Sequence, residues 1–80
     1  MLLDVRTSDE YERVHLPRST LIPLSLLRER ISEVPGDQPV VTICDIGLRA
    51  YEAELILRSA GFDNVNVLEG GIAMWPYGHV

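Results

Sequence analysis

Cysteine is nearly absent from this sequence, since its 80 residues include only Cys44. A single thiol excludes a disulfide within the chain and disfavours a metal site built from several cysteines. We therefore expect no bound metal and no resident cofactor, and any thiol chemistry must use Cys44.

Long apolar runs and positive charge are also scarce. No apolar segment approaches the roughly 20 residues of a membrane-spanning helix, and the amino terminus lacks a basic region followed by an apolar stretch. The chain has 7 Lys and Arg residues against 12 Asp and Glu residues, a formal net charge of -5 at pH 7. Nucleic-acid binding depends on clustered positive charge. We therefore expect a cytoplasmic domain that binds neither membranes nor nucleic acid.

Hydrophobic residues make up 46% of the sequence, which is typical of a folded globular domain. The length suffices for one small domain with a limited core, and the sequence contains no internal repeat and no linker. We expect residues 1–80 to form a single domain.

Short apolar runs alternate with segments of helical character. The runs predict strands over residues 2–5, 20–22, 40–43 and 65–67. The helical segments predict a short helix that begins with a Thr7–Glu10 capping box and a second helix over residues 25–32, with Leu26, Leu27 and Ile31 inward. They also predict a helix over residues 50–60 closed by Gly61 and a last turn over residues 71–75. This alternation is typical of an α/β fold with a parallel sheet flanked by short helices.

Cys44 lies between the strand predicted over residues 40–43 and the helix that follows. Ligands of open α/β sheets bind at this junction, where the first N–H groups and the dipole of the helix favour negative charge. Gly47 permits a positive φ, so that successive N–H groups can turn toward one point. Arg49 adds a cation with a planar set of donors. These surroundings favour the thiolate, which is the nucleophilic form of cysteine.

An isolated cysteine is more often a small buried apolar residue than a nucleophile. Here the position of Cys44 after a strand, with Gly47 and Arg49 behind it, favours the nucleophile. We interpret residues 44–49 as an anion-binding loop around a reactive thiol.

Cys44, Gly47 and Arg49 resemble the active-site loop Cys-x-x-Gly-x-Arg of the rhodanese family of sulfurtransferases. Two flanking segments are similar to this family as well. Residues 2–17 resemble its amino-terminal signature of Asp-Val-Arg, Glu-Tyr and His-Ile-Pro, and residues 68–75 resemble its closing Gly-Gly-x-x-x-Trp element. The three motifs occur in the family's order and span nearly the whole chain.

The resemblance implies a rhodanese-like parallel sheet and a sulfurtransferase that carries sulfane sulfur as a persulfide on Cys44. Arg49 would stand at the end of the loop as a second catalytic residue. The N–H groups that hold the terminal sulfur would come from the substrate-binding loop Asp45, Ile46, Gly47 and Leu48. The partners implied are a sulfane-sulfur donor and a thiol acceptor.

A narrower resemblance concerns residues 22–31, the Gly-Leu-Arg of the loop and the Gly-Phe pair at residues 61–62. These are similar to rhodanese domains appended to flavin-dependent pyridine nucleotide-disulfide oxidoreductases of the coenzyme A-disulfide reductase type. Family members also carry another strand ahead of residue 2. We therefore expect the chain to lack a leading strand and to be a fragment or module of a longer protein, with a flavin-dependent oxidoreductase domain in the same parent chain.

The sequence departs from the family at two places. The usual Pro-Gly-Ala is Pro17-Arg18-Ser19, and the residue after the nucleophile is the acidic Asp45. An adjacent carboxylate opposes thiolate formation and repels an anionic donor such as thiosulfate. Ile46 gives the loop an apolar face, which suits a thiol carrier better than a small dianion.

Two other functions stay open. A phosphatase also places Cys and Arg around an anion, but its loop is one residue longer than the segment between Cys44 and Arg49, which cannot readily surround a phosphoryl group. The other alternative is a noncatalytic rhodanese-homology interaction domain, in which the loop only contacts a partner.

Three further polar residues have more ordinary interpretations. We expect Asp4 and Arg6 to form structural hydrogen bonds beneath the loop. We expect His15 to stabilise a turn, because no Ser or second carboxylate is tied to it by spacing.

Overall fold

A computed structural model of the chain describes residues 1–45 and 48–68. The strands are β1 (Leu2–Asp4), β2 (Ser19–Leu21), β3 (Val40–Ile43) and β4 (Val65–Val67). They form one sheet in the order β2-β1-β3-β4, and every neighbouring pair is parallel. The fold is therefore α/β with a parallel sheet, as the alternation of patterns predicts, and each predicted strand is present within one or two residues of its expected bounds.

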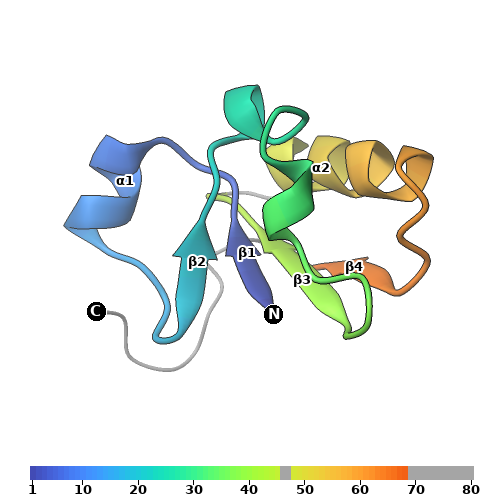
Figure 1. Cartoon of the computed structure of the whole chain (residues 1–80). Helices are drawn as coiled ribbons and strands as arrows, with labels where there is room; N and C mark the ends of the chain where they lie inside the picture. The colour runs from blue at the N-terminus through green and yellow to red at the C-terminus, as the bar shows by residue number, and fades with distance from the viewer. Residues whose placement is uncertain (46–47, 69–80) are drawn as a thin grey trace.

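Two α-helices, α1 (Ser8–Arg13) and α2 (Leu48–Ser59), connect strands of the sheet. Helix α1 lies beside the β2 edge and α2 lies over the β3–β4 half (Figure 1). The predicted capping box is present, because the Thr7 side chain accepts from the Glu10 N–H and the Glu10 side chain accepts from the Thr7 N–H. The capped end of α1 lies a few residues beyond the carboxyl end of β1.

Gly61 ends α2 as predicted. Its φ is 101°, its N–H donates to the Arg58 carbonyl, and the Phe62 N–H donates to the Leu57 carbonyl. This pair of bonds is a Schellman motif, which needs a residue with positive φ at the position of Gly61. Phe62 then packs against the core.

The prediction of a helix over residues 25–32 is wrong. Two 3-10 turns, η1 (Leu24–Leu26) and η2 (Ile31–Glu33), occupy this region. The core contacts of this segment come from Leu24, Leu27, Ile31 and Val34, at spacings of three, four and three residues. This apolar pattern is that of an α-helix, but the backbone forms two separate short turns. Leu26, expected to face inward, is 38% exposed.

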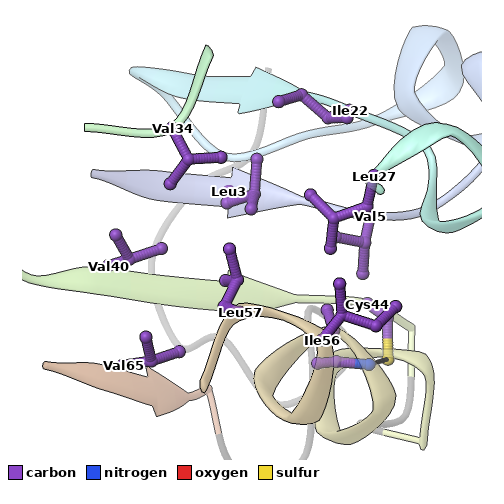
Figure 2. Packing of buried hydrophobic residues seen from close by; sticks show 12 residues of the cluster. Leu3, Val5, Ile22, Leu27, Val34, Val40, Cys44, Ile56, Leu57 and Val65 are labelled. Carbon is purple, nitrogen blue, oxygen red and sulfur yellow. Dashed lines mark hydrogen bonds between the residues drawn. The ribbon is translucent and has the colours of Figure 1, made fainter. Parts of the chain in front are cut away.

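The main core lies between the sheet and α2 with its neighbouring 3-10 turns. Figure 2 shows side chains of β1, β3 and β4 meeting Ile56 and Leu57 of α2, with Cys44 at the end of this cluster. A smaller cluster on the opposite face contains Leu16 and Ile43, with Leu2 and Leu68 against them. The packing fixes both the end of β3 and the start of α2, and these two elements flank the loop that contains Cys44.

Arg18 stands where the motif that residues 2–17 resemble has glycine, and its φ is 66°. The Ser19 N–H donates to the Leu16 carbonyl, so residues 16–19 form a turn with Pro17 second and Arg18 third. This arrangement is typical of a type II turn, whose third position favours glycine. The departure from the family pattern thus places a residue with a Cβ atom in a left-handed conformation.

We predict that Arg18→Gly stabilises the domain. Relief of the left-handed conformation should exceed the added freedom of the unfolded chain, so the melting temperature should rise by about 3–6 °C. Arg18→Ala is the matched control, because it removes the same charge and keeps the Cβ atom. Equal melting temperatures for the Gly and Ala variants would show that the backbone at this turn is not strained.

Candidate active site

Cys44 follows β3 directly, and its side chain points into the main core rather than away from the sheet (Figure 2). It is 1% exposed, and its Sγ accepts a hydrogen bond from the Ala50 N–H at 3.4 Å. Ala50 belongs to the first turn of α2, whose N–H groups have no partner within the helix. The sulfur therefore lies at a helix amino terminus, where negative charge on a thiolate or persulfide is stabilised.

Thr42 fixes the approach of α2 to β3. Its hydroxyl is buried and donates to the Ala50 carbonyl at 2.9 Å. Ala50 thus contacts the sulfur through its N–H and the preceding strand through its carbonyl. These two bonds set the position of the first turn of α2 relative to Cys44.

Arg49 lies one residue before Ala50, but its guanidinium is already paired. Nη1 lies 2.7 Å from Glu10 Oε1, and Nη2 lies 2.9 Å from Glu10 Oε2. Glu10 Oε1 also accepts from the N–H and the hydroxyl of Thr7, at 3.0 and 3.1 Å. The hydrogen bond from Arg49, followed by that from the Thr7 N–H, holds the pKa of Glu10 far below its ordinary value. A bidentate ion pair thus joins the first turns of α1 and α2.

Asp4 and Arg6 form a second, fully buried ion pair. Arg6 Nη2 lies 2.9 Å from Asp4 Oδ2, and its Nε lies 3.0 Å from Asp4 Oδ1. Burial opposes the charge of Arg6, but the hydrogen bonds and charge of Asp4 outweigh it and raise the pKa of the guanidinium. Arg6 Nη2 also donates to the Val14 carbonyl at 2.7 Å. The structural role expected for these two residues is confirmed.

Arg6 has a further contact that sequence reasoning missed. Its Nη1 lies 3.7 Å from Oδ1 of Asp45, whose side chain is 53% exposed. A cation thus stands beside the carboxylate that follows Cys44. The repulsion expected between Asp45 and an anionic donor is therefore partly compensated.

The remaining loop residues divide into two groups. Ile46 and Gly47 lie outside the described residues, so the conformational role predicted for Gly47 and the apolar face predicted for Ile46 stay predictions. Leu48 begins α2 and is 70% exposed. Among the predicted loop residues, the structure thus describes Cys44, Asp45, Leu48 and Arg49.

Two hollows adjoin this region. One of about 190 Å³ is lined by Arg6, Glu10, Arg13, Val14 and Asp45. The lining of another, of about 400 Å³, includes Arg6, Arg49, Leu24, Arg28 and Ile56. A larger hollow of about 470 Å³ lies farther along α2, and none of the described loop residues lines it. Space for a ligand is thus present beside Arg6, which lines both of the smaller hollows, and beside Arg49, which lines one of them.

His15 has a structural role, but it stabilises the end of α1 rather than a turn. Its Nδ1 lies 2.7 Å from the Tyr11 carbonyl oxygen and must donate to it, and the two rings stack with centroids 3.9 Å apart. The Tyr11 hydroxyl in turn donates to the Ser19 carbonyl at 2.7 Å. These contacts tie α1 to the start of β2.

Glu10 is the residue of this region whose role the sequence did not reveal. It is the third helical residue of the capping box, and that role alone accounts for its place in the sequence. The resemblance offered one signal, since Glu10 belongs to the Glu-Tyr of the family signature.

Within residues 1–45 and 48–68, no group of His, Cys, Asp and Glu side chains could hold a metal ion, and no helix is long and apolar enough to cross a membrane.

Comparison with known proteins identifies the family of this chain. Residues 1–76 match the family described as "Rhodanese-like domain". A sulfurtransferase from Allochromatium vinosum is 37% identical over 75 residues, which cover 94% of this chain and 70% of that protein. The chain therefore spans most of a relative that is named for sulfur transfer.

Two solved structures resemble the chain as one part of a much longer protein. The NAD-dependent persulfide reductase from A. fulgidus is 47% identical with a TM-score of 0.82, and the match covers 94% of this chain and 14% of that one. The reduced CoADR-RHD of Bacillus anthracis is 37% identical with a TM-score of 0.83, covering 88% of this chain and 12% of that one. These matches confirm the narrower resemblance to rhodanese domains of larger reductases. By sequence and by fold, the chain belongs to the rhodanese-like domain family.

Proposed function

We propose that the chain is a sulfurtransferase domain that carries sulfane sulfur as a persulfide on Cys44 and passes it to a thiol. The observation that carries this proposal is the hydrogen bond from the Ala50 N–H to the Cys44 sulfur at the start of α2. A helix amino terminus stabilises both the attacking thiolate and the persulfide anion that it forms.

The transfer has two balanced steps. The Cys44 thiolate attacks the sulfane sulfur of the donor, a new S–S bond forms, and the donor's own bond to that sulfur breaks. The leaving group takes the electron pair, as sulfite from thiosulfate or as a thiolate from a persulfide. An acceptor thiolate then attacks the outer sulfur of the Cys44 persulfide, and the Cys44 thiolate leaves. No external oxidant or reductant is needed.

We also propose that residues 1–80 are a module of a flavin-dependent thiol/disulfide oxidoreductase. The two reductases that resemble the chain support this, because the matching region is a small part of each. In such a parent chain, the oxidoreductase domain would supply or consume the thiol partner of Cys44.

A noncatalytic interaction domain is the second candidate, and one observation favours it. Cys44 is 1% exposed. Arg49 is paired with Glu10, and Asp45 lies beside Arg6. A donor can reach the buried sulfur only after a local rearrangement. In the noncatalytic case the thiol would stay buried and unreactive.

Incubation with a sulfane donor followed by intact-mass measurement separates the two candidates. We expect the protein to gain the mass of one sulfur atom, to lose it on reduction, and to gain none as Cys44→Ser. Protein that keeps its original mass after incubation with thiosulfate and with glutathione persulfide would favour the noncatalytic domain. An adduct that persists in Cys44→Ser would contradict the assignment of the carrier.

Asp45→Asn should improve turnover with thiosulfate by about two- to threefold, because it removes a partly exposed carboxylate beside the path of a dianion. The gain is small because Arg6 already compensates part of this charge. Turnover with glutathione persulfide should change less, and the thiosulfate gain should shrink at high salt. Equal thiosulfate rates for wild type and Asp45→Asn at low and high salt would show that Asp45 has no part in donor choice.

A further inference from the structure

The Glu10–Arg49 pair is built more firmly than a surface ion pair. Arg49 Nη1 donates to Glu10 Oε1 at 2.7 Å and Nη2 donates to Oε2 at 2.9 Å, which is the bidentate geometry that gives strong charge-assisted bonds. Glu10 is itself held by two hydrogen bonds from Thr7 at the start of α1. Arg49 therefore cannot turn to another anion without breaking two charged hydrogen bonds.

The two cations closest to the loop are both paired with carboxylates. Arg6 contacts Asp4 and Asp45, and Arg49 is bound by Glu10. A small dianion such as thiosulfate must therefore compete with these carboxylates for Arg6 or Arg49. A persulfide on a larger thiol carrier has one negative charge and a larger surface for other contacts, so it depends less on either guanidinium.

We infer that Glu10 is a specificity-determining residue, which holds Arg49 in a bidentate pair and thereby weakens the binding of small anionic sulfur donors. This inference rests on the proposed sulfur transfer at Cys44. Glu10 and Arg49 are 39 residues apart in sequence and meet because β1 and β3 are neighbours, so that the helices following both strands begin at the same edge of the sheet. Removal of the Glu10 charge should leave Arg49 beside the Cys44 loop as a free anion receptor.

The test measures thiosulfate binding in a Cys44→Ser background, where no sulfur can be transferred. By titration calorimetry at low salt, Glu10→Gln should bind thiosulfate about tenfold more tightly than the Cys44→Ser parent, the order expected when a competing charged pair is removed. Glu12→Gln is the matched control, because Glu12 is an exposed residue of the same helix, and it should change binding by less than about twofold. Adding Arg49→Ala to Glu10→Gln should abolish the gain.

Unchanged or weaker thiosulfate binding in a folded Glu10→Gln protein would overturn the inference, and so would a gain that survives Arg49→Ala. If Glu10→Gln does not fold, Glu10→Asp keeps the charge on α1 but is too short for the bidentate pair, and it should still bind thiosulfate more tightly than Glu12→Asp. Sulfur loading of Cys44 is measured separately on the protein with its thiol. Failure of the proposed function is thereby distinguished from failure of this inference.

Discussion

Cys44→Ser should lower the rate of sulfur transfer from thiosulfate or glutathione persulfide to a dithiol by more than about 10⁴-fold, as loss of a covalent nucleophile does in other enzymes. The chain has no other thiol to take over the sulfur. Serine keeps the size of the side chain, and its oxygen can accept the Ala50 N–H that now reaches the sulfur. The variant should therefore fold, and its loss should be confined to the chemistry.

Steady-state assays on both donors, with the circular dichroism spectrum and melting temperature of each protein, check this expectation. A folded Cys44→Ser protein with more than a few per cent of the wild-type rate would rule out a covalent intermediate on this residue. The assay with two donors also guards against a donor that reacts with the dithiol directly.

Asp4→Ala should destabilise the domain by about 3–5 kcal/mol, the range found when one partner of a buried ion pair is removed. Asp4 is fully buried and Arg6 is 2% exposed, so the variant leaves a guanidinium in the core without its carboxylate. In a domain of this size, that loss corresponds to a fall in melting temperature of about 15–30 °C. Chemical denaturation monitored by circular dichroism measures the free energy of unfolding.

Two further variants show whether the buried charge is the cause. Asp37→Ala removes an exposed carboxylate and should change the free energy of unfolding by less than about 0.5 kcal/mol. Asp4→Leu combined with Arg6→Met removes both charges and should recover most of the loss. A single Asp4→Ala variant as stable as Asp37→Ala would show that the pair contributes little to the fold.

Local sequence patterns predicted the features that depend on neighbouring residues. The strand Val40–Ile43 follows from a β-branched run bounded by turn residues, and both the Thr7 cap and the Gly61 terminus follow from side chains that satisfy helix ends. The position of Cys44 between β3 and α2 was predictable for the same reason, because the strand and the helix are adjacent in sequence.

Features that depend on distant residues were missed. The apolar spacing of the segment between β2 and β3 is that of an α-helix, yet the segment forms two 3-10 turns, Leu24–Leu26 and Ile31–Glu33, where it packs on the core. The pairing of Arg49 with Glu10 arises only when β1 and β3 lie side by side, so the sequence indicated a free cation at the loop. The contact of Arg6 with Asp45 depends on the same juxtaposition.

The transfer of labelled sulfur through Cys44 tests the central claim most directly. Protein would be loaded with a donor carrying radioactive sulfane sulfur, freed of excess donor, and mixed with an acceptor thiol. If the domain is a sulfur carrier, one equivalent of label is bound per chain and passes to the acceptor in a single turnover, with the thiol of Cys44 regenerated. Label that never binds, or that stays on the protein while the acceptor thiol remains unlabelled, would contradict the account.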